Sequence, residues 1–165
     1  MADSARTTSS LSQQTENYRS ATRLIERLHR LYLDVIRAEL ERMGIDDLSA
    51  VQALLLSNIG TAEVNVKTLM ERGYYQGSNA SYNLKKLVEA GYIEQFRSSH
   101  DRRATIVRLT SSGLDLCERL DASEELFATG FDSSGNAFTE MVNRMTALER
   151  GWTDHIRFGP QTRET

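Results

Sequence analysis

The chain has 165 residues, 39 % of them hydrophobic and 26 % charged, and a formal net charge of −3. These values are typical of one soluble globular domain with added arms. The sequence has no apolar run of about 18 residues, and its N-terminus has no apolar core of the kind found in secretory signals, so we expect a cytoplasmic protein with no membrane partner. The single cysteine, Cys117, excludes an internal disulfide and a cysteine-rich metal site.

The first 44 residues divide into a polar arm and a long helix. Residues 1–17 are rich in small polar side chains and predict a disordered N-terminal arm. Residues 18–44 predict the N-terminal helix of a dimerisation region. Leu24, Leu28, Leu31 and Val35 recur at helical spacing and form one apolar stripe, and Gly44 is a suitable helix stop.

Residues 45–113 predict two short helices, a third amphipathic helix and a β-hairpin. The two short helices are expected in SAVQALLLSNIG and VNVKTLMERG. The first is expected to end at Gly60 and the second at Gly73. The helix ASYNLKKLVEAG begins after the capping residues Ser78 and Asn79. Its inward face is expected to consist of Ala80, Leu84, Leu87 and Val88. Two β-prone runs, YIEQFR and ATIVRL, then flank the polar turn SSHDRR.

The C-terminal part, residues 114–157, predicts two helices, followed by a tail over residues 158–165. Its last helix carries a heptad seam of apolar side chains, namely Phe138, Met141, Met145, Leu148 and Trp152. That seam either packs within the chain or meets a second copy. We favour a homodimer whose interface also includes Leu24 and Leu28, because small winged-helix units close their core without such a helix.

This order of elements predicts a mainly α fold with a small β-hairpin wing, a winged helix-turn-helix. Between residues 77 and 108, six basic residues face three acidic ones, which gives this segment a net charge of +3. A basic element on an acidic chain suits double-stranded DNA. The outward face of the third helix could enter the major groove; it consists of Ser78, Tyr82, Lys85, Lys86 and Glu89. In the turn, Arg102 and Arg103 are suited to entering a narrow minor groove, and His100 could lie next to a phosphate. Asp101 is expected to accept hydrogen bonds within the loop.

The segment DRRATIVRLTSSG resembles the wing signature of MarR-type transcriptional regulators, in which D-x-R precedes a strand ending in L-T-x-x-G. The upstream LVEAGYI is similar to that family's recognition-helix exit. The resemblance covers roughly residues 18–156, with its specific motifs in about 75–113. It implies an obligate homodimer on a pseudo-palindromic operator, usually a repressor, that is released from DNA by a small aromatic or phenolic effector or by oxidants. Asp101 and Arg103 match D-x-R, and Asn79 and Ser81 join the recognition-helix residues. Tyr82 stands where many relatives carry Arg, so the preferred operator sequence is expected to differ.

Several side chains have open interpretations. His29, Tyr32 and Ser57 are candidates for orienting the effector, or they make ordinary hydrogen bonds at a helix junction. Cys117 lies between Leu116 and Leu120 and is expected to be a buried structural thiol. No metal-ligand spacing or catalytic motif is present, so we expect neither a cofactor nor an enzyme. The alternative function is a winged-helix module whose wing binds an acidic protein partner.

Overall fold

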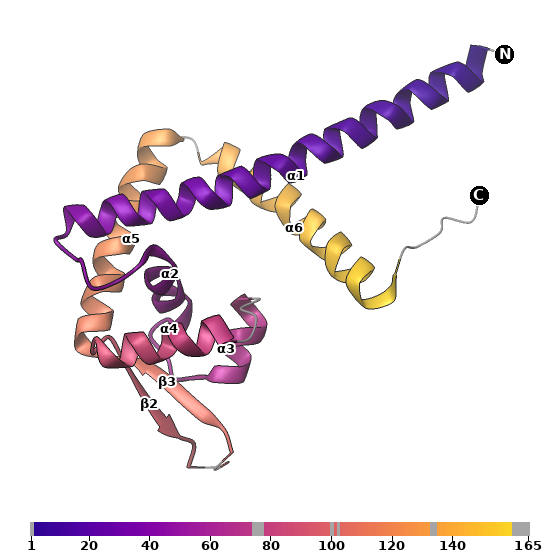
Figure 1. Cartoon of the computed structure of the whole chain (residues 1–165). Helices are drawn as coiled ribbons and strands as arrows, with labels where there is room; N and C mark the ends of the chain where they lie inside the picture. Colours follow the sequence, from indigo (N-terminus) through magenta and orange to yellow (C-terminus); the bar gives the residue numbers. More distant parts are fainter. Residues whose placement is uncertain (1, 74–77, 100, 102, 133–134, 160–165) are drawn as a thin grey trace. The chain divides into compact units, whose positions relative to one another are not determined.

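The computed structural model describes the chain except for residues 1, 74–77, 100, 102, 133–134 and 160–165 (Figure 1). It forms two compact units, Met1–Arg119 and Leu120–Thr165. The elements in chain order are α1 (Ala2–Arg42), α2 (Ala50–Ile59), β1 (Val64–Asn65), α3 (Val66–Gly73), α4 (Ser78–Glu89), β2 (Ile93–Arg97), β3 (Thr105–Leu109), α5 (Ser111–Phe131) and α6 (Asn136–Phe158).

Helix α1 is longer than the sequence predicts. It extends to Ala2, so residues 2–17 continue the helix where a disordered arm was expected. The sequence has no Gly or Pro between residues 2 and 43, and nothing therefore interrupts helical hydrogen bonding there. The helix ends at Arg42 and is terminated by a turn at Gly44, which has φ +72°; the Ile45 amide donates to the Leu40 carbonyl at 2.9 Å. This is the Schellman arrangement that glycine permits.

The core of the first unit lies where α2, α3 and α4 pack with the sheet. Helix α2 begins with a capping box, in which the Ser49 hydroxyl accepts from the Gln52 amide and the Gln52 side chain accepts from the Ser49 amide. Side chains from every layer are almost completely buried, including Leu55, Leu56, Leu69, Leu87 and Val107. This core holds α4 and the hairpin in one lobe.

The sheet has three antiparallel strands in the order β1-β3-β2. Strands β2 and β3 form the predicted hairpin, with Ile93 opposite Leu109 and Arg97 opposite Thr105. The additional strand β1 places Val64 opposite Val107. The sequence does not reveal β1, because two residues are too short to show an alternating pattern.

Helix α5 starts at the root of the hairpin. The Thr110 hydroxyl accepts from the Gly113 amide at 3.2 Å and donates to the Gly91 carbonyl at 2.7 Å. A Cβ on Gly113 would stand 2.2 Å from the carbonyl oxygen of Tyr92. Glycine is therefore required there for close packing of α5 on the strand entrance, which explains the last position of the L-T-x-x-G motif.

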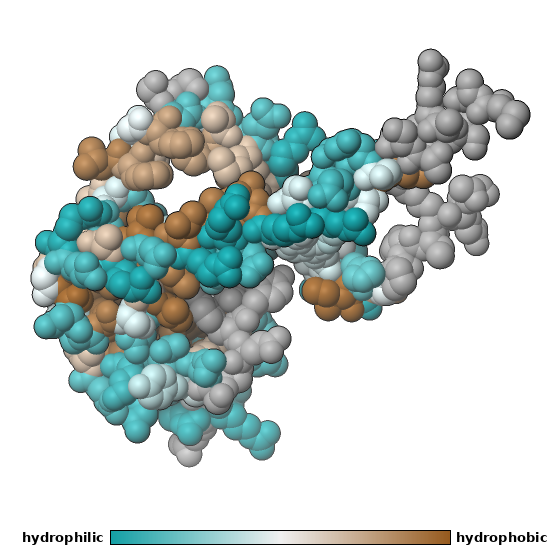
Figure 2. Space-filling view, turned by 45° about the horizontal axis from the view of Figure 1, so that its top comes forward, coloured by the Kyte–Doolittle hydropathy of each residue, from teal (hydrophilic) through white to brown (hydrophobic). Residues whose placement is uncertain are grey.

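The second unit consists of the end of α5 and all of α6. Phe131 lies between Phe127 and Phe138, with ring centroids 6.2 Å and 5.4 Å away. No described residue of α6 is buried. Figure 2 shows brown apolar side chains open at the surface among the teal polar ones. In the described part of the chain, no helix is long and apolar enough to cross a membrane.

Candidate nucleic-acid interface

Helix α4 has one face in the core and the other in solvent. Ala80, Leu84 and Leu87 are at most 3 % exposed, as the sequence predicts. Val88 is 38 % exposed, so the prediction that it faces inward is wrong. Each residue advances about 100° around an α-helix, so Val88 lies off the buried stripe that Ala80, Leu84 and Leu87 form. Among the predicted contact residues, Asn79, Ser81, Tyr82, Lys85 and Lys86 are all exposed.

The wing turn is closed by Asp101. Its carboxylate accepts a hydrogen bond from the Arg103 amide at 2.9 Å, and its own amide donates to the Ser98 hydroxyl at 3.3 Å. The backbone pair between Ser98 and Ala104 closes the same turn at 3.0 Å. The prediction that Asp101 accepts hydrogen bonds within the loop is confirmed. The acidic residue therefore has a structural role in the wing, because its carboxylate fixes the backbone that carries Arg103.

The arginines of the hairpin differ in their partners. Arg108 donates to Glu94 at 2.9 and 3.0 Å, approaches Glu63 at 3.3 Å, and lies 5.2 Å from the Phe96 ring centroid. The hydrogen bond to Glu94 and the negative charge of Glu94 raise the pKa of Arg108 above its usual value. Arg97 donates to the Thr105 hydroxyl at 3.3 Å. Within the described residues, Arg97 and Arg103 have no ion pair with a carboxylate. Arg108 therefore braces the sheet, and Arg97 and Arg103 keep their charges available to a polyanion.

Two lysines and one carboxylate share the outer face of α4. Lys86 Nζ lies 2.7 Å from Glu89 Oε2, and Lys85 Nζ lies 3.6 Å from Glu89 Oε1. The Lys86 ammonium also lies 5.9 Å from the centroid of the Tyr82 ring. The hydrogen bond between Lys86 and Glu89 raises the pKa of Lys86 and lowers the pKa of Glu89. Both lysine side chains are exposed to solvent.

Comparison with known proteins agrees with this geometry. Residues 48–113 match a family described as a winged helix DNA-binding domain. The chain is 35 % identical over 146 residues to the exopolysaccharide II synthesis transcriptional activator ExpG of Rhizobium meliloti (strain 1021), covering 86 % of this chain and 75 % of that protein.

Solved structures share the fold. The Streptococcus pneumoniae FabT complex with DNA has a TM-score of 0.64 and 21 % identity, covering 81 % of this chain and 98 % of that one. A cysteine-to-serine mutant of MarR from E. coli, complexed with operator DNA, has a TM-score of 0.58 and 22 % identity, covering 75 % of this chain and 91 % of that one.

The chain belongs to the MarR family. It is a winged-helix DNA-binding transcriptional regulator, and the family is one of regulators rather than enzymes. In this MarR-type chain α4 is the recognition helix and the β2–β3 hairpin is the wing. The predictions of family, of fold class and of a regulator that is not an enzyme are confirmed. Three predicted contacts of the MarR-type interface lie outside what the structure describes: His100, Arg102 and the side chain of Ser78.

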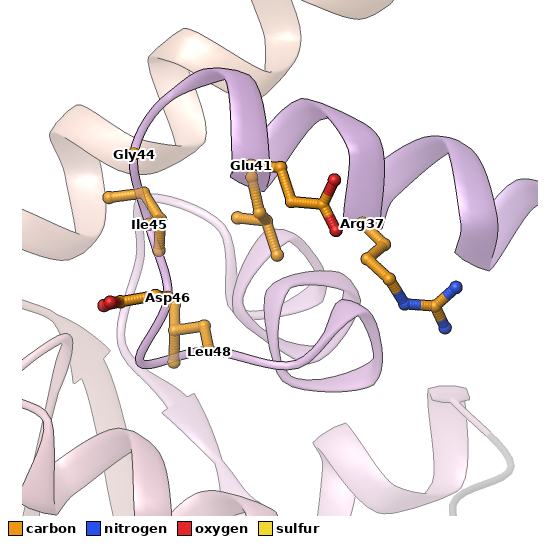
Figure 3. Close-up of a pocket in the computed structure, with 7 residues that line it drawn as sticks. Arg37, Glu41, Gly44, Ile45, Asp46 and Leu48 are labelled. Carbon is orange, nitrogen blue, oxygen red and sulfur yellow. The ribbon is translucent and has the colours of Figure 1, made fainter.

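The three predicted effector residues line none of the described depressions. His29, Tyr32 and Ser57 are exposed, and the Ser57 hydroxyl donates to the Ala53 carbonyl at 3.3 Å, an ordinary helical hydrogen bond. An open depression of about 460 Å³ lies instead where α1 turns into α2. Figure 3 shows Arg37 and Glu41 from α1 and Ile45, Asp46 and Leu48 from the turn around it.

Further predictions concern the sulfur and metal chemistry of the MarR-type chain. Cys117 is partly exposed, whereas a buried thiol was expected. Leu116 and Leu120 lie one turn apart on the buried face of α5, and Cys117 lies about 100° around the helix from Leu116. Its neighbours Leu116 and Leu120 are buried, 1 % and 7 % exposed. Among the described side chains, no three His, Cys, Asp or Glu residues are grouped so as to hold a metal ion.

Sequence reasoning missed residues that position the interface. Tyr92 connects the wing to the α1–α2 turn, since its hydroxyl donates to Asp47 at 3.2 Å. Arg119 on α5 donates to the Met43 carbonyl at 3.1 Å in the same turn. Tyr92 and Asp47 are 45 positions apart, and no local sequence pattern predicts a contact over that distance. A mostly buried tyrosine usually finds a partner for its hydroxyl, but the partner can be identified only in the folded chain.

Proposed function

We propose that the chain acts in the cytoplasm as a homodimer on a pseudo-palindromic operator. Operator binding is supported by a cationic wing beside an exposed recognition helix. Dimerisation is supported by apolar side chains of α1 and α6 that are exposed to solvent in the single chain. Leu24 and Leu28 of α1 are 42 % and 41 % exposed, and Met141 and Met145 of α6 are 37 % and 43 % exposed. Apolar stripes of this kind are covered in a stable protein, and a second copy supplies the matching surface.

In this arrangement each subunit places α4 in a major groove. Asn79, Ser81 and Tyr82 face base edges, with a tyrosine hydroxyl in place of the arginine fork that reads guanine in many relatives. Arg103 enters the flanking minor groove, where a narrow groove concentrates negative potential. Two-fold symmetry spaces the half-sites about one DNA turn apart.

The direction of control follows from the place of the operator. A dimer bound across a promoter excludes polymerase and represses, which is the role that the family resemblance implies, whereas the similar ExpG is named an activator. We propose repression for operators that overlap the promoter. Genes for extracellular polysaccharide synthesis are the first candidates, since the name of ExpG refers to them.

A small aromatic or phenolic effector would control the dimer by favouring a spacing of the recognition helices that does not fit the operator. A coupling of about 1–3 kcal/mol weakens DNA binding roughly 5–150-fold. His29, Tyr32 and Ser57 remain the proposed contacts on the helices that set this spacing.

The test is fluorescence anisotropy with labelled duplex from the gene's own upstream region beside a scrambled duplex of the same composition. We expect tighter binding to the upstream duplex, and a large loss of that binding in Arg103→Ala. Equal binding to both duplexes, unchanged by the substitution, would contradict an operator-reading function. Capture of an acidic protein instead of DNA would support the protein-interaction alternative.

A further inference from the structure

Glu89 occupies an unusual place on the recognition helix. It is the last residue of α4, where the helix dipole presents its negative end and favours cations rather than anions. Its side chain is 45 % exposed and makes no contribution to the core. The helix dipole therefore disfavours a carboxylate at this position, and its ion pairs with Lys85 and Lys86 are what offset that cost.

The partners of Glu89 are the two cations that α4 carries on its DNA-facing side. One carboxylate oxygen faces Lys86 at 2.7 Å and the other faces Lys85 at 3.6 Å. Tyr82, one turn before, adds a ring 5.9 Å from the Lys86 ammonium. A single carboxylate thus neutralises half of the local positive charge and holds both ammonium groups along the helix.

We propose that Glu89 is a specificity-determining residue that holds Lys85 and Lys86 back from the phosphate backbone and so limits sequence-independent binding. The inference rests on the proposed placement of α4 against DNA. Each lysine must leave Glu89 before it can neutralise a phosphate. Contacts from Asn79 or Tyr82 to base edges involve no such exchange. The carboxylate thereby weakens the phosphate contacts, which contribute to binding of every DNA sequence. It leaves unchanged the contacts to base edges, which contribute only at the operator.

The consequence appears in the salt dependence of binding to a random duplex, which is held by phosphate contacts alone. The logarithm of the binding constant falls with the logarithm of salt concentration with a slope of about −0.9 per neutralised phosphate. Glu89→Gln frees two lysines, so the slope should steepen by about 1.8. Between 200 and 50 mM salt, the advantage of the variant over wild type should then grow about 12-fold.

The experiment measures anisotropy of a labelled random duplex and of the upstream duplex over that salt range. Full-length wild type and Glu89→Gln are compared with Glu140→Gln on α6, which removes the same charge from an i,i+4 pair with Arg144. Equal gains in both variants would show that net charge alone matters, and would overturn the proposal.

A second set of variants tests whether the effect of Glu89 passes through the two lysines. In the Lys85→Gln, Lys86→Gln double variant, adding Glu89→Gln should leave the slope unchanged. A steeper slope there would also overturn the proposal, because the effect would not pass through these lysines. Binding of wild type to neither duplex would contradict the DNA-reading function itself, whereas normal wild-type binding with no gain in Glu89→Gln would contradict only the role of Glu89.

Discussion

At the scale of single residues, the availability of a cation depends on its partners rather than on its presence in the sequence. Arg97 and Arg108 both lie in the wing, yet Arg108 is bonded to Glu94 and approached by Glu63, while Arg97 meets a threonine hydroxyl. An arginine already paired with carboxylates gains less from phosphate, because it must give up existing contacts.

Arg97→Gln should therefore reduce the salt slope of DNA binding by about one, since it removes one phosphate contact. The matched control is Arg108→Gln combined with Glu94→Gln, which keeps the net charge and should leave the slope nearly unchanged. Anisotropy titrations at several salt concentrations measure both. A larger loss of slope in the control pair would show that Arg108, not Arg97, contacts DNA.

Gly113 is a residue at which a single methyl group should be costly. Gly113→Ala brings Cβ to 2.2 Å from the Tyr92 carbonyl oxygen, and backbone must shift to accept it. Overpacking of this kind costs about 1–3 kcal/mol in the free energy of unfolding. Gly130→Ala in the same helix meets nothing within 4 Å and should be neutral or stabilising by up to about 1 kcal/mol. Denaturant unfolding of both variants is the measurement, and equal effects would contradict the packing described at Gly113.

At the scale of elements, the sequence predicts what has a repeating pattern and misses what does not. The period of α4 and the alternation of the hairpin place Ala80, Leu87 and the wing turn correctly. The two-residue strand β1 and the Tyr92–Asp47 contact have no periodic signal, because each depends on segments that meet only in the folded chain. The contact of Arg108 with Glu63 is equally non-local, since the two residues are 45 positions apart, whereas its pair with Glu94 joins opposite residues of the predicted hairpin.

The contact between Tyr92 and Asp47 joins the wing root to the α1–α2 turn and should be sensitive to high pH. Burial first, and then the charge of Asp47, raise the pKa of Tyr92 above its ordinary value of 10.0. The folded state therefore keeps this proton at a pH where the unfolded chain has lost it. The resulting stabilisation is complete below pH 10 and disappears as pH rises through the folded-state pKa.

Unfolding measured across this range should thus show a steeper loss of stability above pH 10 for wild type than for Tyr92→Phe. Tyr92→Phe should also unfold more easily at neutral pH, because Asp47 loses its donor. Parallel pH profiles for the two proteins would contradict the assigned contact.

At the scale of the whole molecule, the proposed function requires a second copy of the chain. The apolar stripe of α1 and the seam of α6 are regular in sequence and exposed in the folded chain, and these two properties together favour association. The candidate DNA-contacting residues follow from one chain, whereas the spacing of two recognition helices depends on the proposed dimer.

Leu28→Gln combined with Met145→Gln should shift the protein toward monomers and reduce operator binding, because two polar amides replace buried apolar contacts at the interface. The control combines Arg30→Gln on α1 with Arg144→Gln on α6, both charged positions that the dimer does not need. Light scattering coupled to gel filtration measures the mass of each. An unchanged mass in the first pair would place the interface elsewhere.

If two copies of this winged helix read one operator, hydroxyl-radical footprinting of the upstream duplex should show it. We expect protected patches related by two-fold symmetry, with their centres about one helical turn apart. Inserting five base pairs between the patches should abolish binding, since the second recognition helix would then face the opposite side of the DNA. A single patch, or binding that survives the insertion, would contradict a dimer that reads one operator.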